Sequence, residues 1–172
     1  MVARETCQIC GCEMRSAFRA VLLNRHDVQY FSCSSCGLLR TEKPYWLDAA
    51  YSSAIVDTDT GLVGRNLRNA RLLEPILHRA VGDEGTVLDI GGGYGLLARL
   101  LRDRGFNAYT DDPYCESVFA RHFEPRPGFQ AAMLTAFEVF EHAEDIRATL
   151  EAAFARYSCR RIIFSTATFE GE

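Results

Sequence analysis

Residues 88–97, LDIGGGYGLL, place one acid and four glycines between two apolar flanks. A glycine-rich turn between a strand and a helix often holds a cofactor phosphate, and Gly93, Gly95 and Ala98 satisfy the dinucleotide pattern G-x-G-x-x-G/A. A second pattern, D-x-G-x-G-x-G, is satisfied by Asp89, Gly91, Gly93 and Gly95. A tight turn without a ligand is the third interpretation, since glycine adopts such backbone conformations freely. The glycine spacing alone does not choose among the three.

Asp89 indicates which kind of cofactor the turn favours. It lies near the end of a predicted strand, so its carboxylate is beside the turn and near the helix N-terminus where a pyrophosphate would bind. Two anions at one amide-rich site repel each other. A cofactor that carries an ammonium and a sulfonium, but no phosphate, gains from the same carboxylate. S-adenosylmethionine (SAM) has these groups.

The segment VLDIGGGYG resembles motif I of the class I SAM-dependent methyltransferases, and two later segments extend the resemblance over residues 45–165. GFNAYTDDPY is similar to the second-strand segment, which implies that Asp112 accepts hydrogen bonds from the ribose hydroxyls and that Asp111 shares or replaces this role. AFEVFEH, residues 136–142, is similar to the fourth-strand segment, whose end lies beside the methyl donor. From the residues alone, the two acids can instead cap a helix that starts at Pro113. The resemblance implies an α/β fold with a Rossmann-like parallel sheet.

Glu138, Glu141 and His142 have the spacing E-x-x-E-H, which on a helix places the carboxylates one turn apart. Carboxylates with an imidazole can hold a divalent cation or act as a general base. The segment resembles those of small-RNA 2′-O-methyltransferases and ubiquinone-pathway O-methyltransferases, in which such residues bind a metal that activates a hydroxyl. The simpler alternative is that Glu141 caps the following helix. All three residues are candidates for catalysis near the acceptor.

Four cysteines form two C-x-x-C-G units with 22 residues between them, namely Cys7, Cys10, Cys33 and Cys36. Four thiolates at this spacing bind Zn²⁺ tetrahedrally, and each glycine permits the turn that directs amides at sulfur. We therefore predict a structural zinc ribbon, with reduced buried thiols or a redox pair as the alternative. Cys12 is a spare thiol that can compete as a ligand. A ribbon ahead of a methyltransferase also resembles the nucleotide-sugar C-methyltransferases, but their long C-terminal domain has no counterpart here.

Charge and hydropathy disfavour nucleic-acid and membrane partners. The net charge is −4, the pI is about 5.6, and no long Lys/Arg run is present. Residues 1–46 carry six basic and four acidic side chains, so with a zinc tetrathiolate the ribbon is near neutral. No signal peptide and no run of 18 apolar residues occurs, which together with metal-type cysteine spacing predicts a cytoplasmic protein. We expect a small-molecule methyl acceptor, a sugar or another metabolite.

The elements that position these residues follow from apolar periodicity. We divide the chain into a zinc ribbon (1–44), a linker with a helical cap (45–81) and a SAM-binding domain (82–172). Strand and helix alternate after residue 82, which predicts parallel pairing. The predicted strands are 18–23 and 28–32 in a ribbon hairpin, then 86–90, 106–110, 132–137 and 161–165. The predicted helices are one within 45–60, then 61–81, 94–104, 113–120 and 143–157.

The helix at 61–81 has Asp59 or Thr60 as its expected N-cap, and Pro75 should kink or split it. Arg65, Asn66 and Asn69 share one of its faces, for which solvent exposure is the simpler interpretation and substrate contact the alternative.

The class I sheet has the strand order 3-2-1-4-5-7-6, and this sequence supplies at most the first five of those strands. We therefore expect a truncated chain or a reduced variant, whose open edge is covered by a homodimer partner or by the N-terminal segment. Three alternatives to a small-molecule methyltransferase stay open: a non-catalytic zinc-ribbon binding module on a degenerate fold, a metal-assisted O-methyltransferase, and a nucleotide-dependent oxidoreductase.

Overall fold

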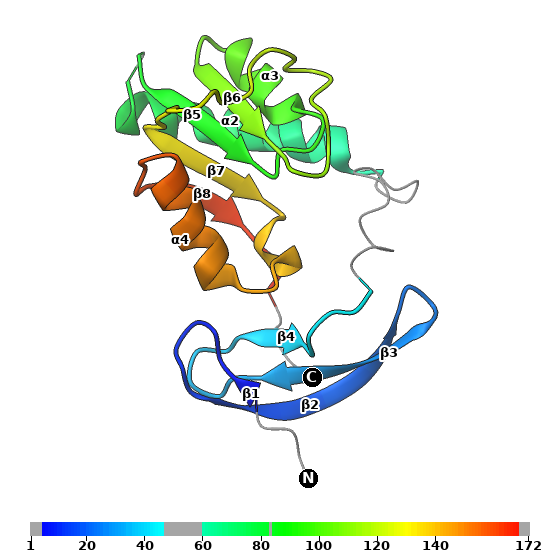
Figure 1. Cartoon of the computed structure of the whole chain (residues 1–172). Helices are drawn as coiled ribbons and strands as arrows, with labels where there is room; N and C mark the ends of the chain where they lie inside the picture. The colour runs from blue at the N-terminus through cyan, green and yellow to red at the C-terminus, as the bar shows by residue number, and fades with distance from the viewer. Residues whose placement is uncertain (1–4, 47–59, 83, 169–172) are drawn as a thin grey trace. The chain divides into compact units, whose positions relative to one another are not determined.

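The structure is a computed structural model that describes residues 5–46, 60–82 and 84–168 (Figure 1). Its contacts divide the chain into two compact units. The first is built mainly from the N-terminal residues up to Ser52, and the second comprises Ser53–His142 and Glu151–Ala167. Each unit is described by itself. No helix among the described residues is long and apolar enough to cross a membrane.

The N-terminal unit contains an antiparallel sheet of four strands in the order β1-β2-β3-β4. The strands are β1 (Glu5–Thr6), β2 (Glu13–Leu22), β3 (His26–Ser32) and β4 (Leu39–Thr41). The predicted hairpin is confirmed, although β2 begins five residues before the predicted start. Leu23 and Asn24 turn the chain with positive φ angles of 50° and 57°. Met14 and Phe31 pack with the buried cysteines Cys7 and Cys33 to form its small core.

The second unit contains a parallel sheet in the order β6-β5-β7-β8. Its strands are β5 (Thr86–Ile90), β6 (Asn107–Asp111), β7 (Met133–Phe137) and β8 (Ile162–Ser165). The central strands β5 and β7 are short apolar runs, as expected for strands that are covered on both faces. Val87, Leu88 and Leu134 are fully buried. The predicted α/β class with a parallel sheet is confirmed, and the order matches the 2-1-4-5 part of the class I sheet.

Helix α2 (Leu62–Ala80) is continuous, so the predicted split at Pro75 is wrong. Leu73 and Leu77 lie on either side of the proline and are both buried in the core, which holds the two halves on the same face of the sheet. The N-cap residue is Gly61, which has no side chain to cap the helix, so the expected cap by Thr60 is not formed. Asp59, the other expected cap, lies outside the described residues, as does nearly all of the segment 45–60 in which a helix was expected.

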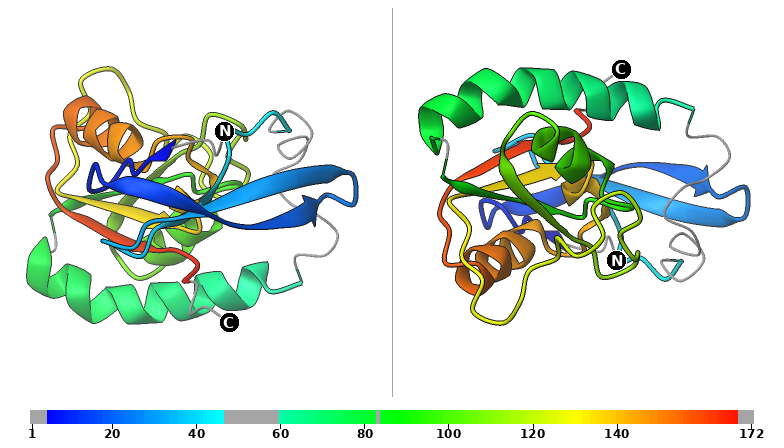
Figure 2. Two further views of the ribbon diagram at one scale, coloured as in Figure 1. Left: turned by 90° about the horizontal axis from the view of Figure 1, so that it is seen from below. Right: turned by 90° about the horizontal axis from the view of Figure 1, so that it is seen from above.

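Helix α4 spans Ile146–Arg156, and its part from Glu151 onward belongs to this unit. This part and α2 lie on opposite faces of the parallel sheet (Figure 2). Helix α3 (Leu96–Arg102) follows the glycine turn, and its Leu97 and Leu101 pack in the same core as α2. Both α3 and α4 are shorter than predicted. Residues 113–120 are described and do not form the predicted helix. The amides of Val118 and Phe119 donate to the carbonyl oxygen of Tyr94 instead of to carbonyl groups four residues earlier.

Candidate functional site

The turn between β5 and α3 requires glycine at two of its positions. Gly91 has a φ of 64°, and a Cβ atom there would lie 2.7 Å from Cγ2 of Val139. A Cβ atom at Gly92 would lie 2.6 Å from Oδ2 of Asp89. The backbone at Gly92 is therefore packed directly against Asp89, which is the fourth of the five residues of β5. Gly93 also has a positive φ, but its Cα faces open space.

Asp89 is a buried acid with a defined partner. Its side chain is 4% exposed, and the hydroxyl of Thr135 on β7 donates to Oδ1 at 2.7 Å. Burial raises the pKa of Asp89 to about 7, an effect that the Thr135 hydrogen bond opposes and the negative charge of Asp112 reinforces. A cation bound beside Asp89 would favour its ionised form. Sequence reasoning missed Thr135, since nothing in its own spacing indicates that it contacts Asp89.

A cavity of about 350 Å³ lies beside this turn. Its walls come from the glycine turn, from α2, and from the residues that follow β7 and end β8. The predicted site residues on these walls are Asp89, Gly91, Gly93, Glu138 and His142. Gly95 does not line this cavity; a Cβ atom there would lie 2.5 Å from Oγ of Ser117, so this glycine permits close packing at the start of α3. The structure thus brings most of the predicted donor and catalytic residues together.

A second cavity, of about 430 Å³, shares Gly93 as a lining residue with the first. Asp112 lines it, with Oδ2 accepting from the amide of Gly93 at 2.9 Å and Oδ1 from the amide of Tyr114 at 2.8 Å. Asp112 therefore fixes the glycine turn, and the helix that it was alternatively expected to cap does not form. Asp111 also lines this cavity, but its carboxylate accepts from the hydroxyl of Tyr157. A ribose-binding role for either acid stays a prediction.

Glu138 directly follows β7 and has a positive φ of 57°. The predicted pairing of Glu138 and Glu141 on one helical turn is therefore wrong, because only Phe140–His142 forms a short 3₁₀ helix. Glu138 accepts a hydrogen bond from the hydroxyl of Ser165 at 2.6 Å, whereas Glu141 accepts from Thr166 at 3.3 Å. Such a backbone conformation in a non-glycine residue costs about 1–3 kcal/mol and is concentrated at functional sites.

Glu141 is not one of the residues that line the first cavity, and it does not cap α4. Asp145 has that role, since its Oδ1 accepts from the amide of Ala148 at 2.9 Å. An acid immediately before the helix was a signal that sequence reasoning missed. Within the described residues, Glu138, Glu141 and His142 do not come close enough together to form a cluster of metal-binding side chains.

A family model described as a methyltransferase domain matches residues 64–168, a range that contains the glycine turn, β5 to β8 and nearly all of both cavities. The chain belongs to this methyltransferase domain family. No curated protein matches the sequence. The family and the sheet order together support a class I methyltransferase, and membership implies SAM as the methyl donor.

The residues of this methyltransferase domain fit that donor. Asp89 offers a buried carboxylate to a cationic group, and at Gly93, which lines both cavities, nothing lies within 4 Å of an added Cβ, so the turn is open there. Thr110 supports the fit at the second cavity, because its buried Oγ1 has no hydrogen-bond partner among the described residues. Polar atoms that are buried without a partner are rare and often mark a ligand position.

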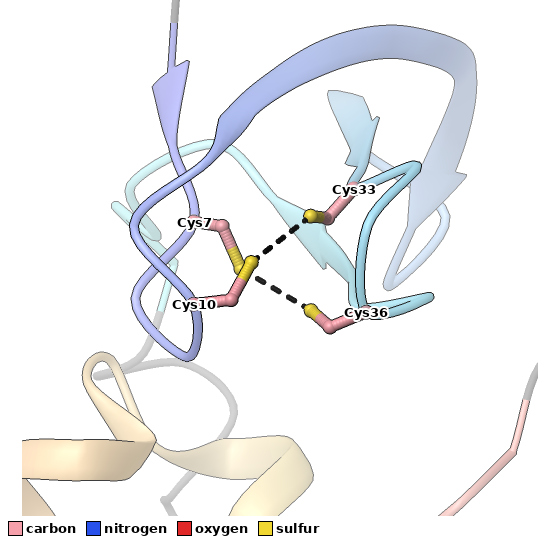
Figure 3. A group of neighbouring side chains, drawn as sticks. All are labelled: Cys7, Cys10, Cys33 and Cys36. Atoms are coloured by element: carbon pink, nitrogen blue, oxygen red, sulfur yellow. Dashed lines mark hydrogen bonds between the residues drawn. The ribbon is translucent and has the colours of Figure 1, made fainter.

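The predicted metal ligands of the N-terminal unit converge on one point (Figure 3). The four Sγ atoms lie within 4.8 Å of one another, with 3.5 Å between Cys7 and Cys36 and 3.5 Å between Cys10 and Cys33. This cluster is compatible with zinc. Cys12 is exposed and is not part of the cluster.

The two cysteine turns have the same backbone geometry. The amide of Gly11 donates to the carbonyl of Cys7 at 2.8 Å, and the amide of Gly37 donates to that of Cys33 at 2.9 Å. Both glycines have positive φ, 74° and 76°. The backbone amides of Cys36 and Ser35 lower the pKa of Cys33 to about 6, against the opposing effect of burial. The backbone amide of Leu38 lowers the pKa of Cys36, but burial and the neighbouring thiols outweigh it and raise this pKa to about 12. A bound cation would favour the thiolate form of these cysteines.

Proposed function

We propose that this domain transfers a methyl group from SAM to a small-molecule acceptor inside the cavity between the glycine turn, α2 and Glu138, and that the four clustered cysteines hold a structural Zn²⁺. The observation that carries the proposal is the buried Asp89 carboxylate beside a glycine turn that borders this cavity. Within the described part of the chain, the hydrogen bond that this buried carboxylate accepts comes from the neutral Thr135 hydroxyl, so its charge is unfavourable unless a cation or a proton compensates it.

Asp89, Gly91 and Gly93 would hold the amino-acid part of the donor, and Asp112 with the second cavity its nucleoside part. When bound, the donor supplies a methyl group on a positively charged sulfur, which the acceptor displaces in line. Asp89 would bind the ammonium group as a carboxylate, held in orientation by Thr135. Gly95, the remaining predicted donor residue, would act indirectly, by permitting the close packing against Ser117 at the start of α3.

Glu138 and His142 are the proposed groups on the acceptor side. Both line the cavity, and the hydroxyl of Ser165 holds one oxygen of Glu138 in place. The other oxygen of Glu138, or the imidazole of His142, can take the proton that an oxygen, nitrogen or carbon acceptor loses on methylation. Glu141, the third candidate, would act indirectly by keeping the segment after β7 attached to Thr166.

All seven cysteines are free of disulfide bonds. We propose a structural rather than catalytic metal, because four cysteine ligands leave no open coordination position, and a reducing compartment, the cytoplasm, on the strength of the paired cysteine spacing.

Donor binding by calorimetry tests the proposed function. We expect the wild-type protein to bind SAM and its demethylated product, S-adenosylhomocysteine. Asp89→Asn should weaken binding by about tenfold or more, because the charge-assisted hydrogen bond to the ammonium is lost. Asp103→Asn is the matched control, since Asp103 is exposed and pairs with Arg99 at 2.8 Å on the opposite end of α3. No heat with either compound in the wild-type protein would refute the proposal.

A further inference from the structure

The first cavity has a polar wall on α2 that the proposed donor site does not use. Four polar side chains of this helix line the cavity, namely Arg65, Asn66, Arg68 and Asn69. Their spacing places them on one face of the helix. Arg65 and both asparagines are half-buried, whereas Arg68 is exposed. This face is therefore part of the cavity, and the simpler expectation of a fully solvated face does not hold.

The wall has a charge opposite to that of the rest of the cavity. The remaining ionisable side chains on its lining are Asp89, Tyr94, Glu138 and His142. Asp89 is at the buried end beside the glycine turn, and Glu138 is held by the hydroxyl of Ser165. Arg65 and Arg68 therefore form the basic side of the cavity. The planar donor geometry of a guanidinium group suits a carboxylate or a phosphate, so this side of the cavity favours an anion over a cation.

The amides next to the arginines are directed by the helix itself. Nδ2 of Asn66 donates to the carbonyl of Leu62 at 2.9 Å, one turn earlier, which fixes its side chain along the helix surface. Asn69 lies one helical turn after Arg65 and supplies a further donor beside the two guanidinium groups. The wall thus offers several hydrogen-bond donors to a single ligand.

We propose that the methyl acceptor carries an anionic group, a carboxylate or a phosphate, and that Arg65 and Arg68 bind it. This inference rests on the proposed function. An anionic acceptor is attracted both by the arginines and by the positive sulfonium of the donor. The donor has a carboxylate of its own that the arginines could bind instead, and the experiment below distinguishes the two anions. The anion at α2 would place the rest of the acceptor between the donor and Glu138.

Titration with inorganic phosphate tests the anion site. Phosphate is added to protein saturated with S-adenosylhomocysteine, and binding is followed through the Nε–Hε signals of ¹⁵N-labelled arginine. Arg65→Gln and Arg68→Gln should each weaken phosphate binding about tenfold, because each removes a charge-assisted hydrogen bond. Arg71→Gln is the matched control: Arg71 is exposed on the same helix but does not line the cavity. It should leave phosphate affinity unchanged.

The affinity for S-adenosylhomocysteine is measured on the same four proteins. Equal affinity in all four, with phosphate weakened only in the two cavity variants, supports the inference. Equal phosphate affinity in all four overturns it. Weaker S-adenosylhomocysteine binding in the cavity variants without an effect on phosphate also overturns it, because the wall would then bind the carboxylate of the donor. If the wild-type protein does not bind S-adenosylhomocysteine, the proposed function fails, and the same phosphate titration of the free protein still tests the wall.

Discussion

Asp89 is the residue whose charge depends most on what occupies the cavity. Burial raises its pKa to about 7, so at neutral pH the free protein holds a mixture of acid and carboxylate. The unfolded chain releases this proton near the ordinary value of about 4. The stability that protonated Asp89 contributes is therefore fully present below about pH 4 and is lost as the pH rises through about 7.

We predict that the free energy of unfolding of the wild-type protein, compared with that of Asp89→Asn, falls between about pH 4 and about pH 7 and then levels off. Asparagine has no proton to lose, so the difference between the two proteins isolates Asp89. Donor affinity should rise over the same window, since the carboxylate is the binding form. Thermal or denaturant unfolding of both proteins across this range measures the effect, and parallel pH profiles would contradict it.

Thr135 is a positioning residue for Asp89. We predict that Thr135→Val lowers the free energy of unfolding by about 1–3 kcal/mol, because a buried carboxyl loses its hydrogen bond. The pH midpoint of donor binding should also move upward, since that hydrogen bond lowers the pKa of Asp89. Denaturant unfolding and calorimetry at several pH values measure both changes.

Thr110→Val is the control for the stability effect. Thr110 is also a buried strand residue, at 2% exposed, but its hydroxyl has no partner among the described residues. Its replacement should change stability little. Equal losses in the two variants would mean that the Thr135 hydroxyl has no special role.

At the scale of elements, the glycine turn is held in place by direct backbone contact. We predict that Gly91→Ala destabilises the domain by more than about 1 kcal/mol, because its φ is positive and the new methyl group would meet Val139. Gly64→Ala is the matched control: nothing lies within 4 Å of the added Cβ, and the position is helical. It should stabilise by up to about 1 kcal/mol. Denaturant unfolding distinguishes the two, and the same sign for both would contradict the packing described here.

The cysteine turns are the corresponding element of the N-terminal unit. We predict about one zinc per chain by elemental analysis of the purified protein, and its loss in Cys7→Ser. Without the metal, the buried Cys7–Cys33 core of the small sheet should lose its ordered NMR signals, since such units fold with their metal. Cys12→Ser should keep the zinc, because Cys12 is outside the cluster. Wild-type protein that is fully folded without zinc would contradict the prediction.

At the scale of the whole molecule, the sequence predicted what depends on burial and on spacing. Strand β5 was predicted at its observed bounds because a short apolar run between breakers has few alternatives, and the cysteine cluster followed from matched C-x-x-C-G units. The predicted helix at 113–120 was wrong because two amides of this segment donate to the carbonyl oxygen of Tyr94, which is distant in sequence. The Glu138 geometry was missed for a similar reason: its positive φ depends on the segment packed around it.

The predicted homodimer stays a prediction, as does the small-molecule nature of the acceptor. Strand β8 is the outermost strand at its end of the described parallel sheet, and its Phe164 is 53% exposed. An apolar edge of this kind favours pairing with another strand. Sedimentation velocity on the purified protein distinguishes a monomer from a dimer, and Phe164→Ser should weaken a dimer that forms through this edge.

The position of the donor methyl group tests the central claim most directly. Bound SAM labelled with ¹³C at its methyl group can be observed by NMR, and nuclear Overhauser effects report the protons around it. The account predicts such effects to the rings of Phe137 and His142, which line the first cavity. Effects to Tyr109 and Phe129, which pack against each other outside that cavity, or no bound signal at all, would contradict it.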